Sequence, residues 1–255
     1  MDPSVVGAVV AACGALSPAQ CDEFLEKGYT IVRGGFPRAV ADSVVDSAWA
    51  SLGDQGILRD TPATWKQAPY TRTQGGERFL MKEVAPLAWQ AQVDVCGGAD
   101  RLPERGEGLA MGGGAIGNLC MNAELGYEPP SAALGGWHKD GWHFRHFLDS
   151  PEQGLLVVPL FSDVLRESGG TQLATDSIGV VARFLSQLPQ GVHADAVQGS
   201  GYLIPQLVQQ CTQFEELVGC AKRPAPVPSF LAFVPSPSWQ YGRFHRKTLS
   251  IETET

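Results

Sequence analysis

The chain has 255 residues and carries 19 Lys and Arg against 27 Asp and Glu, which gives a formal net charge of −8 at pH 7. A net-negative chain without a run of basic residues lacks the charge that binds phosphate backbones, so nucleic acid is not an expected partner. Apolar residues make up 44% and charged residues 18%, which is typical of a chain with a hydrophobic core and excludes a wholly disordered one.

The first predicted elements are a helix, a strand and a second helix. Ser17-Pro18-Ala19-Gln20 combines a capping Ser, a Pro in the first turn and a Gln three residues after the cap, which predicts a helix start. Gly28 should end this helix. The β-branched and aromatic residues 29–32 predict a strand, and apolar residues at helical spacing predict a helix over 40–52.

The next segment, from Gly53 to about Arg105, is rich in Gly, Pro and Trp and has no sustained period, so it predicts no element. Residues 112–117, Gly-Gly-Gly-Ala-Ile-Gly, match the pattern G-x-G-x-x-G. We interpret the match as a loop, because no clear strand precedes it and no helical pattern follows it, as a nucleotide-binding turn would require. A strand is predicted over 115–121.

Strands and helices alternate in the following part of the chain. The apolar run 155–161 predicts a buried strand, and Pro159 within it predicts a sheet edge or a bulge, since proline cannot donate a ladder hydrogen bond. A turn at 168–171 should lead into another short strand. Asp176 or Ser177 should cap a helix that ends before Pro189, and a further helix is predicted over 203–217.

The last 36 residues, Cys220 to Thr255, differ in composition from the rest. They hold 5 of the 18 prolines and 1 of the 30 glycines, and 5 Lys/Arg minus 2 Glu gives them a charge of +3, against 14 − 25 = −11 for residues 1–219. Prolines at this density exclude a helix and interrupt a central strand. The sequence therefore predicts a domain over 1–219 and a poorly ordered, basic tail over 220–255.

His138-Lys139-Asp140 is the motif with the clearest chemistry. On a strand, residues i and i+2 point to the same face, so the imidazole and the carboxylate can bind one metal ion. A second His from another strand would complete a 2-His-1-carboxylate triad, which leaves coordination positions open for substrates. His193-Ala194-Asp195 has the same spacing but lies between predicted helices, so we interpret His193 as a solvated loop residue.

At these residues the sequence resembles the phytanoyl-CoA dioxygenase family of iron(II)- and 2-oxoglutarate-dependent oxygenases. The resemblance covers roughly residues 17–219. It is carried by Gly-Gly-Trp-His-Lys-Asp-Gly (135–141), His-Phe-Arg-His-Phe-Leu-Asp-Ser-Pro (143–151), Ser-Asp-Val (162–164), Gly-Gly-Thr (169–171) and Asp-Ser-Ile-Gly (176–179).

This resemblance implies a mostly β fold with flanking helices, a double-stranded β-helix of the jelly-roll or cupin-like kind. It also implies that His138 and Asp140 are the first two iron ligands. The implied activity is hydroxylation of a small organic substrate, with iron(II) as the metal and 2-oxoglutarate as the co-substrate. No membrane partner is expected.

The chain departs from the family pattern after Gly219. The family requires a distal His and, about ten residues later, an Arg that pairs with the far carboxylate of 2-oxoglutarate. The only His in that part of the chain is His245, which we retain as a candidate third ligand beside the alternative of a solvated basic tail. His143 has the wrong strand parity and His146 is too distant, so both should have core or surface roles.

Two hypotheses follow from this departure. In the first, the protein is an active oxygenase with His138, Asp140 and His245 as ligands. In the second, it is a catalytically inactive, truncated family member that acts as a binding protein or fold relic. We further hypothesise that an alternative splice product, a retained intron or a shifted reading frame replaced the last strands with residues 220–255.

The expected compartment is the cytoplasm. The six cysteines form no C-x-x-C pair, which is typical of reduced intracellular thiols. The longest apolar stretch, Val5–Leu16, has 12 residues and no basic residue before it, so it is too short to span a bilayer and unlike a secretory signal. The sequence identifies neither the substrate nor the oligomeric state.

Overall fold

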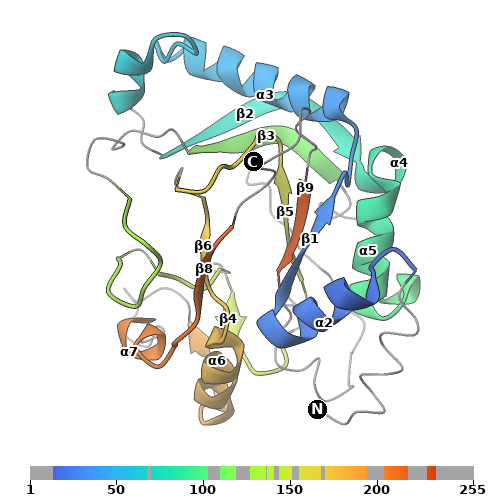
Figure 1. Ribbon diagram of the computed structural model, residues 1–255, viewed down its shortest axis with the longest axis vertical. Coiled ribbons are helices and arrows are strands. Elements are labelled where there is room, and N and C mark those ends of the chain that lie inside the picture. The colour runs from blue at the N-terminus through green and yellow to red at the C-terminus, as the bar shows by residue number, and fades with distance from the viewer. Residues whose placement is uncertain are drawn as a thin grey trace.

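The computed structural model describes residues 14–67, 70–102, 110–118, 127–135, 137–140, 144–150, 155–167, 170–193, 204–217 and 229–233. In this part of the chain, helices surround small antiparallel sheets (Figure 1). No helix among the described residues is both long and apolar enough to cross a bilayer.

The first helix and strand form as predicted. Helix α2 (Pro18–Lys27) begins with a complete capping box, in which the Ser17 hydroxyl accepts from the Gln20 amide at 3.3 Å and the Ser17 amide donates to the Gln20 side chain at 3.0 Å. Gly28 ends the helix with φ of 80°, a left-handed conformation that favours glycine. Strand β1 (Tyr29–Arg33) follows directly.

Helix α3 (Arg38–Gly53) is also predicted, and it covers a ribbon of two strands that is predicted only in part, through the strand expected over 115–121. The ribbon pairs β2 (Tyr70–Leu80) with β3 (Ala110–Asn118), and α3 lies along one of its faces (Figure 1). A short 3-10 helix, η1 (Pro62–Gln67), lies between α3 and β2. The sequence missed β2 and the start of β3, because the glycines of the ribbon hide the alternation on which strand prediction depends.

The G-x-G-x-x-G match is part of β3, so the interpretation as a loop is wrong. Gly112 and Gly113 have φ of 84° and 76°, and the register between β2 and β3 shifts between Gln74 and Arg78. A Cβ on Gly112 would lie 2.4 Å from the Glu77 carbonyl oxygen. The glycines therefore permit a β-bulge with close backbone approach.

A three-stranded sheet in the order β1-β9-β5 forms the centre of the molecule. Strand β5 (Leu156–Leu160) is an edge strand of the described sheet, which confirms the position predicted from Pro159. Strand β9 (Ser229–Phe233) pairs with both neighbours in antiparallel register.

Strand β9 departs from the prediction of poor order across residues 220–255. Its five residues lie between Pro228 and Pro235, so all of them can contribute to the ladder. The apolar stretch Phe-Leu-Ala-Phe is typical of a buried strand. The remainder of the tail lies outside the described residues.

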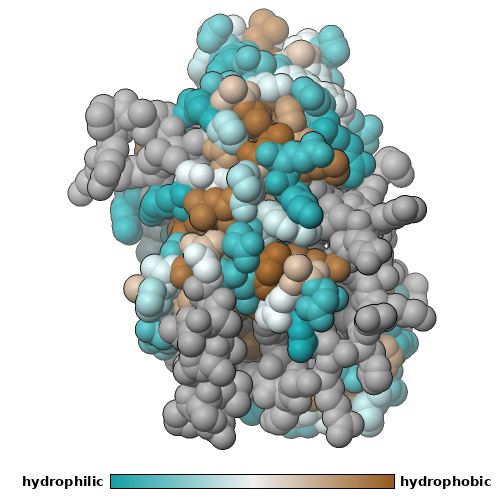
Figure 2. Space-filling view, turned by 90° about the vertical axis from the view of Figure 1, so that its right-hand side faces the viewer, coloured by the Kyte–Doolittle hydropathy of each residue, from teal (hydrophilic) through white to brown (hydrophobic). Residues whose placement is uncertain are grey.

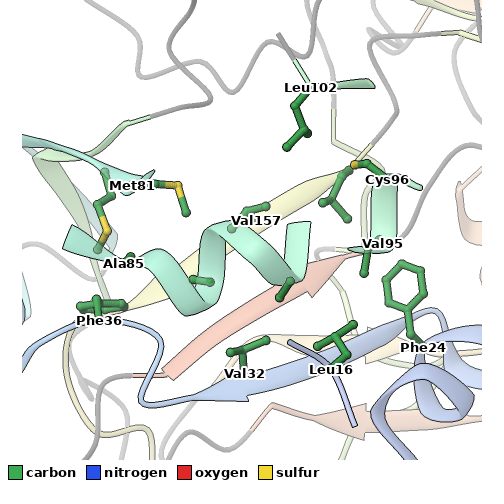
Figure 3. Packing of buried hydrophobic residues seen from close by; sticks show 14 of the residues in the cluster. Leu16, Phe24, Val32, Phe36, Met81, Ala85, Val95, Cys96, Leu102 and Val157 are labelled. Carbon is green, nitrogen blue, oxygen red and sulfur yellow. The ribbon is translucent and has the colours of Figure 1, made fainter. Parts of the chain in front are cut away.

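The largest core cluster lies between this sheet and two helices, α4 (Met81–Val84) and α5 (Pro86–Cys96). Figure 3 shows α5 lying across the sheet, with Val157 of β5 on one side of the helix in this view and Val32 of β1 on the other. The short 3-10 helix η2 (Ala99–Arg101) follows α5.

A second cluster surrounds α6 (Ser177–Ser186), which forms where it is predicted. Near it, β4 (Arg145–His146) pairs with β7 (Val192–His193), and β6 (Gln172–Ala174) pairs with β8 (Phe214–Glu216).

The prediction of one helix over 203–217 is wrong for its second half. Helix α7 (Ile204–Val208) is short, and the chain reaches β8 six residues later. The Asp176 carboxylate accepts the Thr212 amide at 2.7 Å and the Thr212 hydroxyl at 2.9 Å. This side chain fixes an extended backbone, so a tertiary contact overrides the helical pattern.

The described strands form several small sheets and no closed barrel. Their pairings are antiparallel and join strands that are far apart in sequence, such as β1 with β9. The double-stranded β-helix therefore stays a prediction.

A charged network joins the N-terminal elements to β8. Tyr29 donates a hydrogen bond to the Glu215 carboxylate, and Lys27 Nζ lies 3.0 Å from its other oxygen. Burial opposes ionisation of Glu215, but the hydrogen bonds from Tyr29 and Lys27 outweigh it and lower the pKa of the carboxyl group. Burial and the same hydrogen bond raise the pKa of Tyr29.

We expect Glu215→Gln to lower the free energy of unfolding by about 1 kcal/mol at pH 7. Because the pKa of Glu215 is lowered in the folded state, its stabilisation is present above the unfolded pKa and is lost as the pH falls through the folded pKa. Urea unfolding at pH 7 and near pH 3 should show the difference shrinking in acid. The exposed Glu128→Gln is the control, and an equal loss at both pH values would contradict the assignment.

Candidate metal site

His138 and Asp140 are brought together, although not by the strand that the sequence predicted. Residues 137–140 belong to no helix or strand and lie just before β4. His138 Nε2 nevertheless lies 3.3 Å from Asp140 Oδ1. The convergence therefore comes from a local bend of the chain and not from the pleat of a sheet.

The separation of these two atoms fits a shared metal ion. Protein nitrogen and oxygen ligands lie roughly 2.1 Å from a divalent cation of this class. Two atoms 3.3 Å apart can both reach that distance with an angle of about 100° at the metal, which is near the angle of two adjacent ligands in an octahedron. The residues present thus fit two of the three protein ligands in a facial triad.

Both side chains are open to solvent, with 74% of His138 and 64% of Asp140 exposed. The hydrogen bond from His138 holds the pKa of the Asp140 carboxyl below its usual range, against the opposing effect of desolvation. The carboxylate is therefore charged at neutral pH. Desolvation also lowers the pKa of the intervening Lys139 to about 8, with Asp140 acting in the opposite direction.

A third ligand is not found in the described part of the chain, where no three His, Cys, Asp or Glu side chains gather as a metal site would require. The candidate His245 lies outside the described residues, and so does His143. The pair His138 and Asp140 is thus the part of the predicted triad that the structure describes.

The other two histidines of the described residues, His146 and His193, have roles in the fold. His146 is fully buried in β4, and its ring centroid lies 4.5 Å from that of Phe144, which agrees with the predicted core role. His193 is half-buried in β7, opposite Arg145 of β4, so the prediction of a solvated loop residue is wrong. Its partner in the motif, Asp195, lies outside the described residues.

Trp137 fixes the chain immediately before His138, a role that the sequence alone did not predict. Its indole nitrogen donates to the Ser131 carbonyl at 3.0 Å, and its ring lies 5.4 Å from the ring of Phe214 in β8. The available signal was a large aromatic residue next to a candidate ligand. Nothing local pointed to Phe214, which is 77 positions away.

A cavity of about 310 Å³ lies elsewhere, where the chain enters α3 and α5. It is lined by Gly34, Gly35, Phe36, Pro37, Val84, Pro86 and Leu87. Figure 2 shows the side of the molecule on which α4 and α5 lie, and its hydrophobic residues form separate small areas among hydrophilic ones. This cavity does not include His138 or Asp140.

No protein-family model, no curated protein and no solved structure matches this chain.

We expect His138→Ala and Asp140→Asn each to change the free energy of unfolding by less than about 1 kcal/mol, because exposed ion pairs contribute little to stability. Urea denaturation at pH 7 measures the change. Asp42→Asn is the control, since it breaks the exposed Arg38–Asp42 pair at 2.9 Å. A loss of several kcal/mol, as for a cavity in the core, would mean that the pair serves the fold.

Proposed function

We propose that this protein is an iron(II)- and 2-oxoglutarate-dependent dioxygenase that hydroxylates a small organic substrate. The observation that supports the proposal is the convergence of His138 Nε2 and Asp140 Oδ1 at 3.3 Å in an exposed position. An imidazole and a carboxylate are the ligand types of a facial triad. The surrounding motif, Gly-Gly-Trp-His-Lys-Asp-Gly, resembles that of the phytanoyl-CoA dioxygenase family.

In the proposed overall reaction, a substrate C–H group, 2-oxoglutarate and O₂ give the hydroxylated substrate, succinate and CO₂. Iron(II), when bound, supplies the activation of O₂ that no side chain can provide. Asp140 holds a negative charge at neutral pH, since the hydrogen bond from His138 lowers its pKa, and that charge favours a divalent cation at this point.

The exposed position of His138 and Asp140 keeps the candidate metal site accessible. The large exposed fractions of His138 and Asp140 leave room for a co-substrate on the side away from the protein. A cation between the two side chains would replace the proton in their hydrogen bond, because a metal ligand must be deprotonated. We propose His245 as the third ligand.

The proposed fold is the double-stranded β-helix with flanking helices. Antiparallel pairing of strands distant in sequence, as between β5 and β9 or β6 and β8, is typical of jelly rolls. We also propose a cytoplasmic location, which is consistent with the free thiols of Cys21, Cys96 and Cys211.

A second candidate function is that of a catalytically inactive family member that binds a small molecule. It is favoured by the hydrogen bond between His138 and Asp140, which satisfies the pair without a metal. The described part of the chain also adds no third ligand. This candidate keeps the fold and a binding role but not the chemistry.

We expect the purified protein to release succinate from 2-oxoglutarate only when iron(II) is present. His138→Ala should lower that rate by at least 10- to 100-fold, because loss of a ligand costs more than loss of a residue behind it. The assay needs no substrate, since uncoupled turnover of the co-substrate is measured. His193→Ala is the matched control, because His193 also begins a His-x-Asp motif.

Equal activity in His138→Ala and the unaltered protein would assign the turnover to another site. Iron(II) binding that depends on His138, without succinate release at any iron concentration, would contradict the dioxygenase activity and support the inactive family member. Absence of both iron(II) binding and turnover would exclude the dioxygenase and leave the inactive family member as a protein without a metal.

A further inference from the structure

The three side chains of strand β8 contact different parts of the chain on the two faces of the strand. Neighbouring side chains of a strand point to opposite faces, and residues two apart share a face. Phe214 and Glu216 contact the segment that leads to His138, whereas Glu215 contacts Tyr29 and Lys27. The contacts follow the alternation of the strand.

The face with Phe214 and Glu216 meets the segment 127–137 at both of its ends. At one end, Tyr127 donates from its hydroxyl to Glu216 Oε2 at 3.3 Å. At the other, the rings of Phe214 and Trp137 lie 5.4 Å apart with an angle of 53° between their planes. Between these points, the Gln209 side chain donates to the Ala132 carbonyl at 3.1 Å.

Glu216 is itself held in place by the turn that precedes β6. Its Oε2 accepts the Glu167 amide at 2.9 Å, and its Oε1 accepts the Gly170 amide at 3.3 Å. The pairing of β8 with β6 fixes the same residues from the backbone, with Glu216 opposite Gln172. The strand that supports the segment is therefore anchored independently of the segment.

Residues 137–140 have no ladder or helix of their own to orient them. Consecutive Cα atoms are only 3.8 Å apart, so a shift of Trp137 is passed directly to His138. The Trp137 indole is held by the Ser131 carbonyl and by Phe214. These contacts hold the residue that directly precedes His138.

We infer that Trp137 and Phe214 are positioning residues, through which β8 sets the geometry of the His138 and Asp140 pair. The inference rests on the proposed function, because the pair is taken as an iron(II) site. Trp137 and Phe214 act through the backbone of 137–140 and touch neither metal nor substrate. Their loss should weaken iron(II) binding about tenfold or more, as is usual for residues that orient metal ligands.

The test compares iron(II) binding by anaerobic calorimetry in Trp137→Ala, Trp137→Phe, Phe214→Ala and the double variant Trp137→Ala/Phe214→Ala. Trp65→Ala is the matched control. Trp65 also donates its indole N–H to a backbone carbonyl, that of Leu58 at 2.9 Å, and its ring lies 5.8 Å from that of Trp49. Thermal unfolding of each variant gives the structural cost separately.

The expected result is a rise in the iron(II) Kd of about tenfold or more in Trp137→Ala and in Phe214→Ala. The double variant should lose little beyond the larger single loss, since both residues act through one contact. Trp137→Phe keeps a ring against Phe214 and should recover part of the affinity. Trp65→Ala should bind iron(II) as the unaltered protein does, even where its thermal stability falls.

A second measurement separates this inference from the proposed function. Hydrogen exchange of the metal-free protein reports the order of the amides of 137–140, and Phe214→Ala should speed their exchange whereas Trp65→Ala should not. If the unaltered protein binds no iron(II) but this exchange still rises, the proposed function fails and β8 is still the support of the segment. Unchanged exchange, or unchanged iron(II) affinity in a protein that binds it through His138, would overturn the inference.

Discussion

The alternation of side chains along β8 is the constraint on which the arrangement of this molecule depends. Because Phe214 and Glu216 share one face and Glu215 points to the other, a strand of three residues joins the N-terminal helix and strand, the turn before β6 and the segment that carries His138. Each contact contributes on the order of 1 kcal/mol. Together they connect parts of the chain that are up to 188 positions apart.

Features coded by short, local patterns could be predicted from the sequence. The capping box at Ser17, the edge position of Pro159 and the helix after Asp176 depend on residues that are near neighbours. The approach of His138 to Asp140 belongs to the same class, although the predicted strand is absent and a bend takes its place. A spacing of two residues is compatible with both a strand and a bend, and the sequence alone does not distinguish the two conformations.

Features that depend on distant partners could not be predicted. The place of β9 in the sheet depends on its pairing with β1 and β5, and the end of α7 depends on the Asp176 carboxylate, 36 positions from Thr212. In the ribbon, β2 and the start of β3 were missed because glycine contributes no side chain to a hydrophobic pattern. The contact of Trp137 with Phe214 was missed for the same reason as β9, since its partner lies in another element.

The bulge in β3 restricts which substitutions this strand can accept. Three consecutive positions, Gly112 to Gly114, have positive φ, and a methyl group there would meet backbone or side-chain atoms at 2.4 to 2.6 Å. A bulge bends its strand and increases the twist of the ribbon, so the curvature beneath α3 requires that these positions carry no side chain at all. A side chain at any of these three positions would disturb that curvature, so the three glycines should be among the least replaceable residues of the ribbon.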